Sequence, residues 1–282
     1  MDKEIFDLGS LSGKVLLFGG IYSNLQALEE LIRIAKTEGI AAENCICTGD
    51  IIGYCAQPEE SIQLFRDWGA HSILGNVEEQ LSSGADDCGC DFKAGSRCDT
   101  LSKEWYPYAK SRLSGESIRW VKTLPNYVTF RYGDQNVLVV HGSYTHISDF
   151  IFASTPWEQK APSFSERNTD VVVAGHCGIP FHTKHNHLLW LNPGVIGMPA
   201  NEGSPRVWYM ILGESSNLMF THRNYQYDYH TANRLMLQEK LPAAYADTLL
   251  SGLWDNMDIL PEPERKMRGI KLDLGTKAFS FE

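Results

Sequence analysis

The stretch GDIIGYCAQPEE at residues 49–60 decides what kind of fold the chain adopts. The apolar residues before and within it predict a buried strand over 44–50, and Pro58 followed by two acidic residues predicts a helix over 58–68. Upstream, LLFGGIYSNL at residues 16–25 predicts a similar unit, with a strand over 14–20 and a helix over 23–37. Strands that alternate with helices indicate a parallel sheet covered by helices.

The second half of the chain is richer in antiparallel patterns. Strands over 127–132 and 135–141 are separated by Gly133-Asp134, which suits a two-residue hairpin turn. We therefore expect an α/β protein in which two facing mixed β-sheets are flanked by helices. The remaining predicted elements are a strand over 71–75, an ordered loop over 82–95, helices over about 100–113 and 115–123, and strands over 170–175, 187–191, 206–212 and 217–222.

The predicted organisation is one main domain followed by a C-terminal addition. Residues 1–230 form the main domain, with a loop or cap insertion at about 82–125. Residues 231–282 form a helical extension and tail, in which Leu241-Pro242 separates two short helices.

Composition excludes several classes of protein. The chain has 282 residues, of which 43% are hydrophobic, and a net charge of −10. A general nucleic-acid binder needs concentrated Lys and Arg, so that class is disfavoured. No apolar run reaches the roughly 18 residues of a membrane span, and the N-terminus lacks the apolar segment of a signal peptide. We expect a cytoplasmic protein that does not bind membranes.

Four polar residues follow predicted strands next to glycines. Asp50, Asn76, His141 and His176 each come where an apolar run ends. Since glycine lets the backbone turn and approach a ligand closely, these side chains can converge. One carboxylate, one amide oxygen and two imidazoles suit a divalent transition metal, whereas a single histidine after a strand is more often a structural, hydrogen-bonded residue than a ligand.

The order of the motifs GDIIGY, GN, VVHGS, AGH and LNPG resembles the calcineurin-like metallophosphoesterases, especially their small bacterial phosphodiesterase-like branch. The likeness covers residues 14–222, and PRVWYMIL at 205–212 resembles the closing strand of that branch. It implies a four-layer αββα sandwich that holds two metal ions about 3.5–4 Å apart, with a hydroxide attacking phosphorus. It also implies a small-molecule phosphate ester or nucleotide as ligand.

The sequence departs from this family at particular positions. The resemblance places first-metal ligands at Gly20, Tyr22 and Gly178, where the family has Asp, His and His. Asp50 would bridge both metals, and Asn76, His141 and His176 would complete the second site. The catalytic histidine of the family is replaced by Val77.

The resemblance thus implies one retained site, for Mn, Fe or Zn, and one lost site. General acid help is worth about 10²–10⁴-fold, so Val77 predicts weak or lost hydrolysis. Two alternatives stay open: an active metal-dependent hydrolase with one metal or a rebuilt site, and a non-catalytic scaffold.

Several other residues are candidates for lining the site. Tyr22 either contacts a phosphate oxygen or ligates metal, or it simply fills the space left by a metal ion. Asn24, Glu78 and Cys177 lie beside the motifs. The chain has an odd number of cysteines, seven. Three of them are interpreted as a second metal site, as a regulatory disulfide or as small buried thiols; they are Cys88, Cys90 and Cys98.

Overall fold

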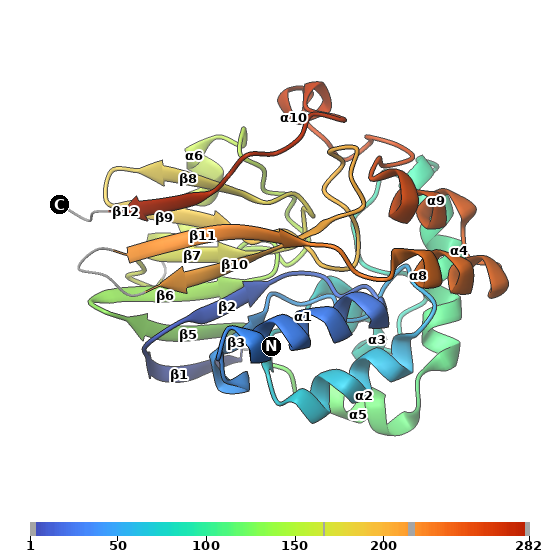
Figure 1. The fold of residues 1–282 in the computed structure, drawn as a ribbon, viewed down its shortest axis with the longest axis horizontal. Coiled ribbons are helices and arrows are strands. Elements are labelled where there is room, and N and C mark those ends of the chain that lie inside the picture. The colour runs from blue at the N-terminus through green and yellow to red at the C-terminus, as the bar shows by residue number, and fades with distance from the viewer. Residues whose placement is uncertain (1–3, 166, 214–217, 280–282) are drawn as a thin grey trace.

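The computed structural model describes residues 4–165, 167–213 and 218–279, and it contains two six-stranded sheets that face each other (Figure 1). The predicted α/β fold with two mixed sheets flanked by helices is confirmed. The first sheet has the order β1 (Ile5–Leu11), β5 (Tyr127–Tyr132), β6 (Gln135–Val140), β7 (Val171–Ala174), β9 (Leu188–Asn192) and β8 (Phe181–His185). The second has the order β12 (Thr276–Phe279), β11 (Leu218–Tyr225), β10 (Val207–Gly213), β2 (Val15–Phe18), β3 (Cys45–Cys47) and β4 (His71–Ser72).

The central strand β2 shows why these residues form buried sheet. All four of its residues are buried, so it reads as a continuous apolar run rather than an alternating one. Val15 and Leu17 pack between the two sheets, while Leu16 and Phe18 face the helices on the outer side. The alternation of side chains along a strand thus supplies both the inner and the outer core.

Helices cover the sheets, and several begin as the sequence predicts. Asn24 caps α1, because its side-chain oxygen accepts a hydrogen bond from the backbone N–H of Ala27. Pro58 opens α2, which ends at Gly69 in the left-handed conformation. The helices are α1 (Leu25–Thr37), α2 (Pro58–Trp68), α3 (Asn76–Ser83), α4 (Arg97–Arg112), α5 (Gly115–Val121), α6 (Trp157–Lys160), α7 (Pro162–Ser165), α8 (Tyr229–Gln238), α9 (Ala243–Ser251) and α10 (Glu262–Lys266).

Some elements differ from the sequence prediction. The predicted loop over 82–95 begins two residues inside α3, and α4 begins earlier than expected. Strand β1 was not expected, because its mixed exposed and half-buried residues give neither an apolar run nor a strict alternation. The hairpin β5–β6 is confirmed, and the strand predicted over 217–222 is β11, although residue 217 lies outside the described residues.

The residues predicted to form a C-terminal extension contact the rest of the fold closely. Helices α8 and α9 pack together, and α8 contacts α1. Strand β12 adds to the second sheet by pairing with β11. Figure 1 shows α8 and α9 beside α4, at the end of the sheets opposite the C-terminus. The division at residue 230 stays a prediction.

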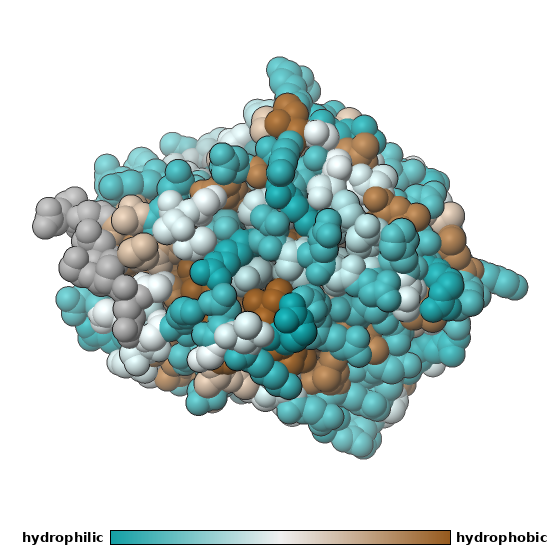
Figure 2. All heavy atoms as spheres, viewed as in Figure 1, coloured by the Kyte–Doolittle hydropathy of each residue, from teal (hydrophilic) through white to brown (hydrophobic). Residues whose placement is uncertain are grey.

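The surface seen from the side of Figure 1 is mostly hydrophilic, with hydrophobic residues scattered across it (Figure 2). Among the described helices, none combines the length and apolar character that a bilayer span requires.

Candidate metal centre and adjoining pocket

The four polar residues singled out in the sequence come together where the two sheets meet. Asp50 follows β3 and Asn76 opens α3 just after β4, so both belong to the second sheet. His141 follows β6 and His176 follows β7 in the first sheet. One ligand atom from each of Asp50, His141 and His176 lies within 4.8 Å of the others, and all three residues are buried. We call Asp50, Asn76, His141 and His176 the retained cluster.

His141 lies at the centre of this cluster. Its Nδ1 is 2.6 Å from the carbonyl oxygen of Thr48, so Nδ1 donates a proton there. In the neutral ring Nε2 then carries a lone pair. That atom lies 3.0 Å from Asn76 Oδ1, 3.0 Å from His176 Nδ1 and 3.3 Å from Asp50 Oδ2. A backbone carbonyl that fixes the tautomer of a histidine is a common feature of metal sites.

The orientation of the Asn76 amide is set by the cysteine-containing loop. Its Nδ2 donates to the carbonyl oxygen of Cys88 at 2.7 Å and to Cys90 Sγ at 3.1 Å. The Oδ1 atom is therefore turned toward His141. Burial, with a further contribution from Cys88, raises the pKa of Cys90 well above its usual value, so the thiol stays protonated. The carbonyl oxygen of Cys88 and the thiol of Cys90 thus position Asn76.

The chemistry of this cluster fits a divalent cation. Carboxylate, amide and imidazole acceptors face one another, so a proton on His141 or a metal ion is needed to satisfy them. Burial and the neighbouring His141 lower the pKa of His176 to about 3, which keeps its ring neutral and able to ligate. His176 Nε2 is buried without a hydrogen-bond partner among the described residues. Nitrogen and oxygen donors of this kind suit Mn, Fe or Zn.

The backbone beside the cluster is strained. Asp50 and His176 have φ values of 59° and 58°, and Tyr22 has a φ of 52°. Non-glycine residues rarely adopt this left-handed region, at a cost of about 1–3 kcal/mol each, and such residues gather at functional sites.

Glu78 stabilises one of these strained turns. Its carboxylate accepts hydrogen bonds from the backbone N–H groups of Asp50 at 2.8 Å, Ile52 at 3.0 Å and Gly75 at 3.0 Å. Burial and the nearby Asp50 raise the pKa of Glu78 to about 7, although these backbone donors oppose the rise. With both oxygens engaged, Glu78 is placed to hold the Asp50 turn.

The other half of the centre, at Gly20 and Tyr22, is filled by an aromatic ring. A Cβ atom placed on Gly20 would lie 2.4 to 2.8 Å from the ring carbons of Tyr22. The Tyr22 ring therefore occupies the space that the Cβ atom of any larger residue at position 20 would need. Tyr22 is 5% exposed. Burial and the charge of Asp50 raise the pKa of its phenol, which favours the neutral form of Tyr22.

Gly178 is covered in a similar way from a distant part of the chain. It has a φ of 76°, and a Cβ placed there would lie 3.3 Å from Cζ2 of Trp254. The indole of Trp254 is held by a hydrogen bond from its Nε1 to the carbonyl oxygen of Pro199 at 2.8 Å. We call Gly20, Tyr22 and Gly178 the emptied half.

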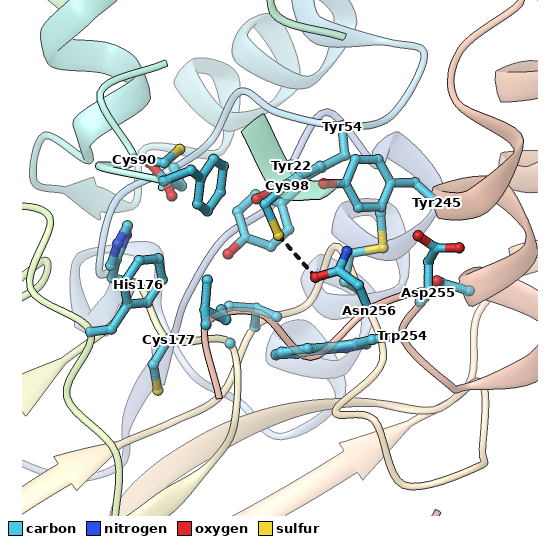
Figure 3. A pocket seen from close by; sticks show the side chains of 18 residues that line it. Tyr22, Tyr54, Cys90, Cys98, His176, Cys177, Tyr245, Trp254, Asp255 and Asn256 are labelled. Atoms are coloured by element: carbon cyan, nitrogen blue, oxygen red, sulfur yellow. Dashed lines mark hydrogen bonds between the residues drawn. The ribbon is translucent and has the colours of Figure 1, made fainter. Parts of the chain in front are cut away.

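A pocket opens between the emptied half and the C-terminal residues (Figure 3). Its volume is about 80 Å³. In Figure 3, His176 and Cys177 lie on one side and Tyr245 and Asp255 on the other. We call this space the aromatic pocket, and its lining includes Tyr22, Asp50, Tyr54, Phe92, Phe150, His176, Tyr245, Trp254, Asp255 and Asn256.

The remaining candidates from the sequence have structural partners. Asn24 caps α1, and its Nδ2 donates to the carbonyl oxygen of Gly197 and to the hydroxyl of Tyr227. Cys177 lines the pocket, and its Sγ accepts from Asn192 Nδ2 at 3.2 Å. Cys98 Sγ donates to Asn256 Oδ1 at 3.2 Å.

The seven cysteines are all free and buried in this structure, in keeping with small buried thiols, and the three interpretations of Cys88, Cys90 and Cys98 stay predictions. No disulfide joins them in this structure.

Sequence reasoning found Tyr22 but missed the other aromatic residues of the pocket. Phe150 packs on His176, with ring centroids 4.2 Å apart. Tyr245 lies on α9 and Trp254 follows it, far along the chain from the strand-end motifs. No local spacing could have revealed them, because only the tertiary fold brings them to the centre.

Comparisons with known proteins agree with this geometry. Residues 14–217 match the sequence profile of the calcineurin-like phosphoesterase superfamily domain. An uncharacterized protein of Methanocaldococcus jannaschii is 25% identical over 256 residues, which is 84% of this chain and 98% of that protein. A metallophosphoesterase from Sphaerobacter thermophilus is similar in structure, with a TM-score of 0.66, 21% identity, and coverage of 86% of this chain and 100% of that one. A hypothetical protein from Pyrococcus horikoshii has a TM-score of 0.69 at 20% identity, with 86% and 99% covered.

Proposed function

The chain belongs to the calcineurin-like phosphoesterase superfamily, and on that premise we propose that it binds a phosphate ester at a single divalent metal held by Asp50, Asn76, His141 and His176, with weak or lost hydrolysis. The observation that carries this proposal is the fit between Gly20 and Tyr22. Because the Tyr22 ring takes the space of any Cβ at position 20, a metal-binding side chain there has no room, which supports the loss of the first metal.

The residues of the retained cluster have separate roles in this proposal. Thr48 holds the ring of His141, and the cysteine loop holds the amide of Asn76. A metal ion bound there would polarise a phosphoryl oxygen and acidify a water molecule.

Hydrolysis is expected to be weak because Val77 replaces the family's catalytic histidine. Val77 has no proton to give to a leaving alkoxide. Glu78 is engaged by three backbone N–H groups and so does not replace the missing histidine.

The alternative of an active hydrolase rests on Tyr22. Its phenol lines the same pocket as Asp50 and His176 and is neutral, so it has a proton to donate. Since burial raises the pKa of this phenol, it is a poor acid, and we place this alternative second. The scaffold alternative is disfavoured by the strained turns at Asp50 and His176, which a chain without a site has no reason to keep.

The test is the metal content of the protein after equilibration with Mn, Zn and Fe, together with hydrolysis of bis(4-nitrophenyl) phosphate. We expect one equivalent of metal per chain, lost in Asp50→Asn, and little turnover. Asp255→Asn is the matched control, because it removes the same charge from the far wall of the pocket.

Other outcomes would change the conclusion. Two equivalents of metal with rapid, metal-dependent turnover would reinstate a working hydrolase. If the wild-type protein binds no metal, only the alternative of a non-catalytic scaffold remains.

A further inference from the structure

We propose that the aromatic pocket binds a neutral aromatic ring, which is the organic group of the phosphate ester held by the retained cluster. This inference rests on the proposed function and extends it to the class of ligand. The pocket and the cluster share Asp50 and His176, so a phosphate at the cluster leaves its ester group facing the pocket.

The walls of the pocket offer aromatic surfaces that are already fixed in place. Tyr54 makes edge-to-face contacts with Tyr22 and with Tyr245, both with ring centroids 4.7 Å apart. On its other side Tyr54 packs on Trp105 at 4.8 Å. Figure 3 shows Trp254 as a flat plate across the pocket from Tyr22. A planar ring that enters meets surfaces that need no ordering, which reduces the entropy lost on binding.

The polar groups of the pocket favour an uncharged ligand. The lining residues include two carboxylates, Asp50 and Asp255, and neither Lys nor Arg. Asp255 is paired with Arg97 at 2.7 Å, outside the lining. A second phosphate or a carboxylate in the pocket would therefore meet the charge of Asp50, while Arg97 is already paired with Asp255. The ester is thus expected to carry one phosphate and a neutral ring.

The pocket also holds an unused hydrogen-bonding group. Tyr22 lines the pocket, and within the described residues no hydrogen bond to its hydroxyl is found. A ring heteroatom or an ester oxygen that bonds to this hydroxyl would stabilise the complex. The volume of about 80 Å³ is several times the roughly 10–15 Å³ that one water molecule needs.

The test is calorimetric titration of the Mn-loaded full chain with three probes: diphenyl phosphate, dibutyl phosphate and inorganic phosphate. The two diesters carry the same single charge and differ in whether their organic groups are aromatic. We expect diphenyl phosphate to bind about tenfold more tightly than dibutyl phosphate. Inorganic phosphate reports on the retained cluster alone.

Two variants and a control locate the effect. Tyr245→Leu and Trp254→Leu should each reduce the preference for the aromatic diester to about twofold or less while inorganic phosphate still binds. Trp157→Leu removes a partly buried tryptophan that stacks on His185 outside the pocket, and it should keep the full preference. Thermal unfolding of each variant shows that it is folded.

The two proposals fail in different ways. If inorganic phosphate binds but the two diesters bind equally, the ring-binding pocket is overturned and the proposed function stands. If none of the three probes binds the Mn-loaded protein, the proposed function fails and the pocket inference falls with it.

Discussion

The two halves of the centre are held together by different forces. In the retained cluster, hydrogen bonds fix each side chain: Thr48 holds His141, and Cys88 holds Asn76. In the emptied half, van der Waals contacts fix the side chains. The Tyr22 ring packs against Gly20, and Trp254 packs against Gly178. Glycines and aromatic rings fit one another here, so on the proposed function an apolar site stands where the family resemblance places first-metal ligands.

The largest expected effect is on stabilisation by metal, which should depend on the retained cluster and not on the emptied half. Saturating Mn at 100 times its dissociation constant should stabilise the wild-type protein by about 2.7 kcal/mol, and a chelator should remove that gain. Asp50→Asn should show no gain, whereas Trp254→Leu should keep it in full. Thermal unfolding with and without Mn measures both. If Trp254→Leu abolished the stabilisation by Mn as Asp50→Asn does, the distinction between the two halves would be wrong.

The second prediction concerns the fit of Gly20 and Tyr22. Gly20→Asp should lower the free energy of unfolding by about 3 kcal/mol, because its Cβ enters the Tyr22 ring. The double variant Gly20→Asp/Tyr22→His should recover about 1 kcal/mol or more, since the smaller ring makes room.

Denaturant unfolding measures this coupling, and a good control is Gly115→Asp. Its Cβ would come no nearer than 3.5 Å to Arg119, and an acidic residue suits the first turn of α5. Strictly additive costs in the double variant would contradict the fit.

The third prediction concerns Glu78, which supports the retained half. Glu78→Gln should destabilise the fold by about 2 kcal/mol, because an amide NH₂ turned toward backbone N–H groups leaves donors unpaired. Its neighbour Glu79 makes no such set of bonds, so Glu79→Gln should change stability by less than about 0.5 kcal/mol. Equal effects of the two substitutions in urea unfolding would show that the Asp50 turn does not depend on Glu78.

The smallest effect is expected at Cys90, behind Asn76. Cys90→Ser keeps an acceptor for Asn76 Nδ2, and the carbonyl oxygen of Cys88 continues to hold that amide. Metal affinity should therefore fall by only about threefold, well below the 10–100-fold often seen when such a supporting contact is lost. Competition with a coloured chelator measures it. A complete loss of metal would assign Cys90 itself as a ligand.

Much of this architecture could be predicted from the sequence. The helix predicted over 58–68 has these bounds in the structure, and the prediction rests on Pro58 and the two acidic residues after it. Asp50, Asn76, His141 and His176 could be picked out because each follows an apolar run beside glycine, and the fold does bring them together. These features could be predicted because they depend on residues that are neighbours in the sequence.

The aromatic pocket could not be predicted, because it depends on tertiary packing. Tyr245 and Trp254 carry no motif, and their position follows from how α8 and α9 dock beside α4 and α1. Strand β12 was missed for a related reason, since its exposed residues give no periodic signal and only pairing with β11 defines it.

The position of β2 in its sheet has a consequence for how the chain reaches this structure. Leu17 pairs with Ile46 on one side and with Met210 on the other, so the strand stays half-paired until residues 207–213 leave the ribosome. Contacts between residues so distant in sequence slow folding. Until they form, the unpaired edge of β2 is exposed and can pair with other strands. Trp254, which covers Gly178, emerges later still. During biosynthesis, the residues proposed to hold metal should therefore assemble before Trp254, which is proposed to contact the ring.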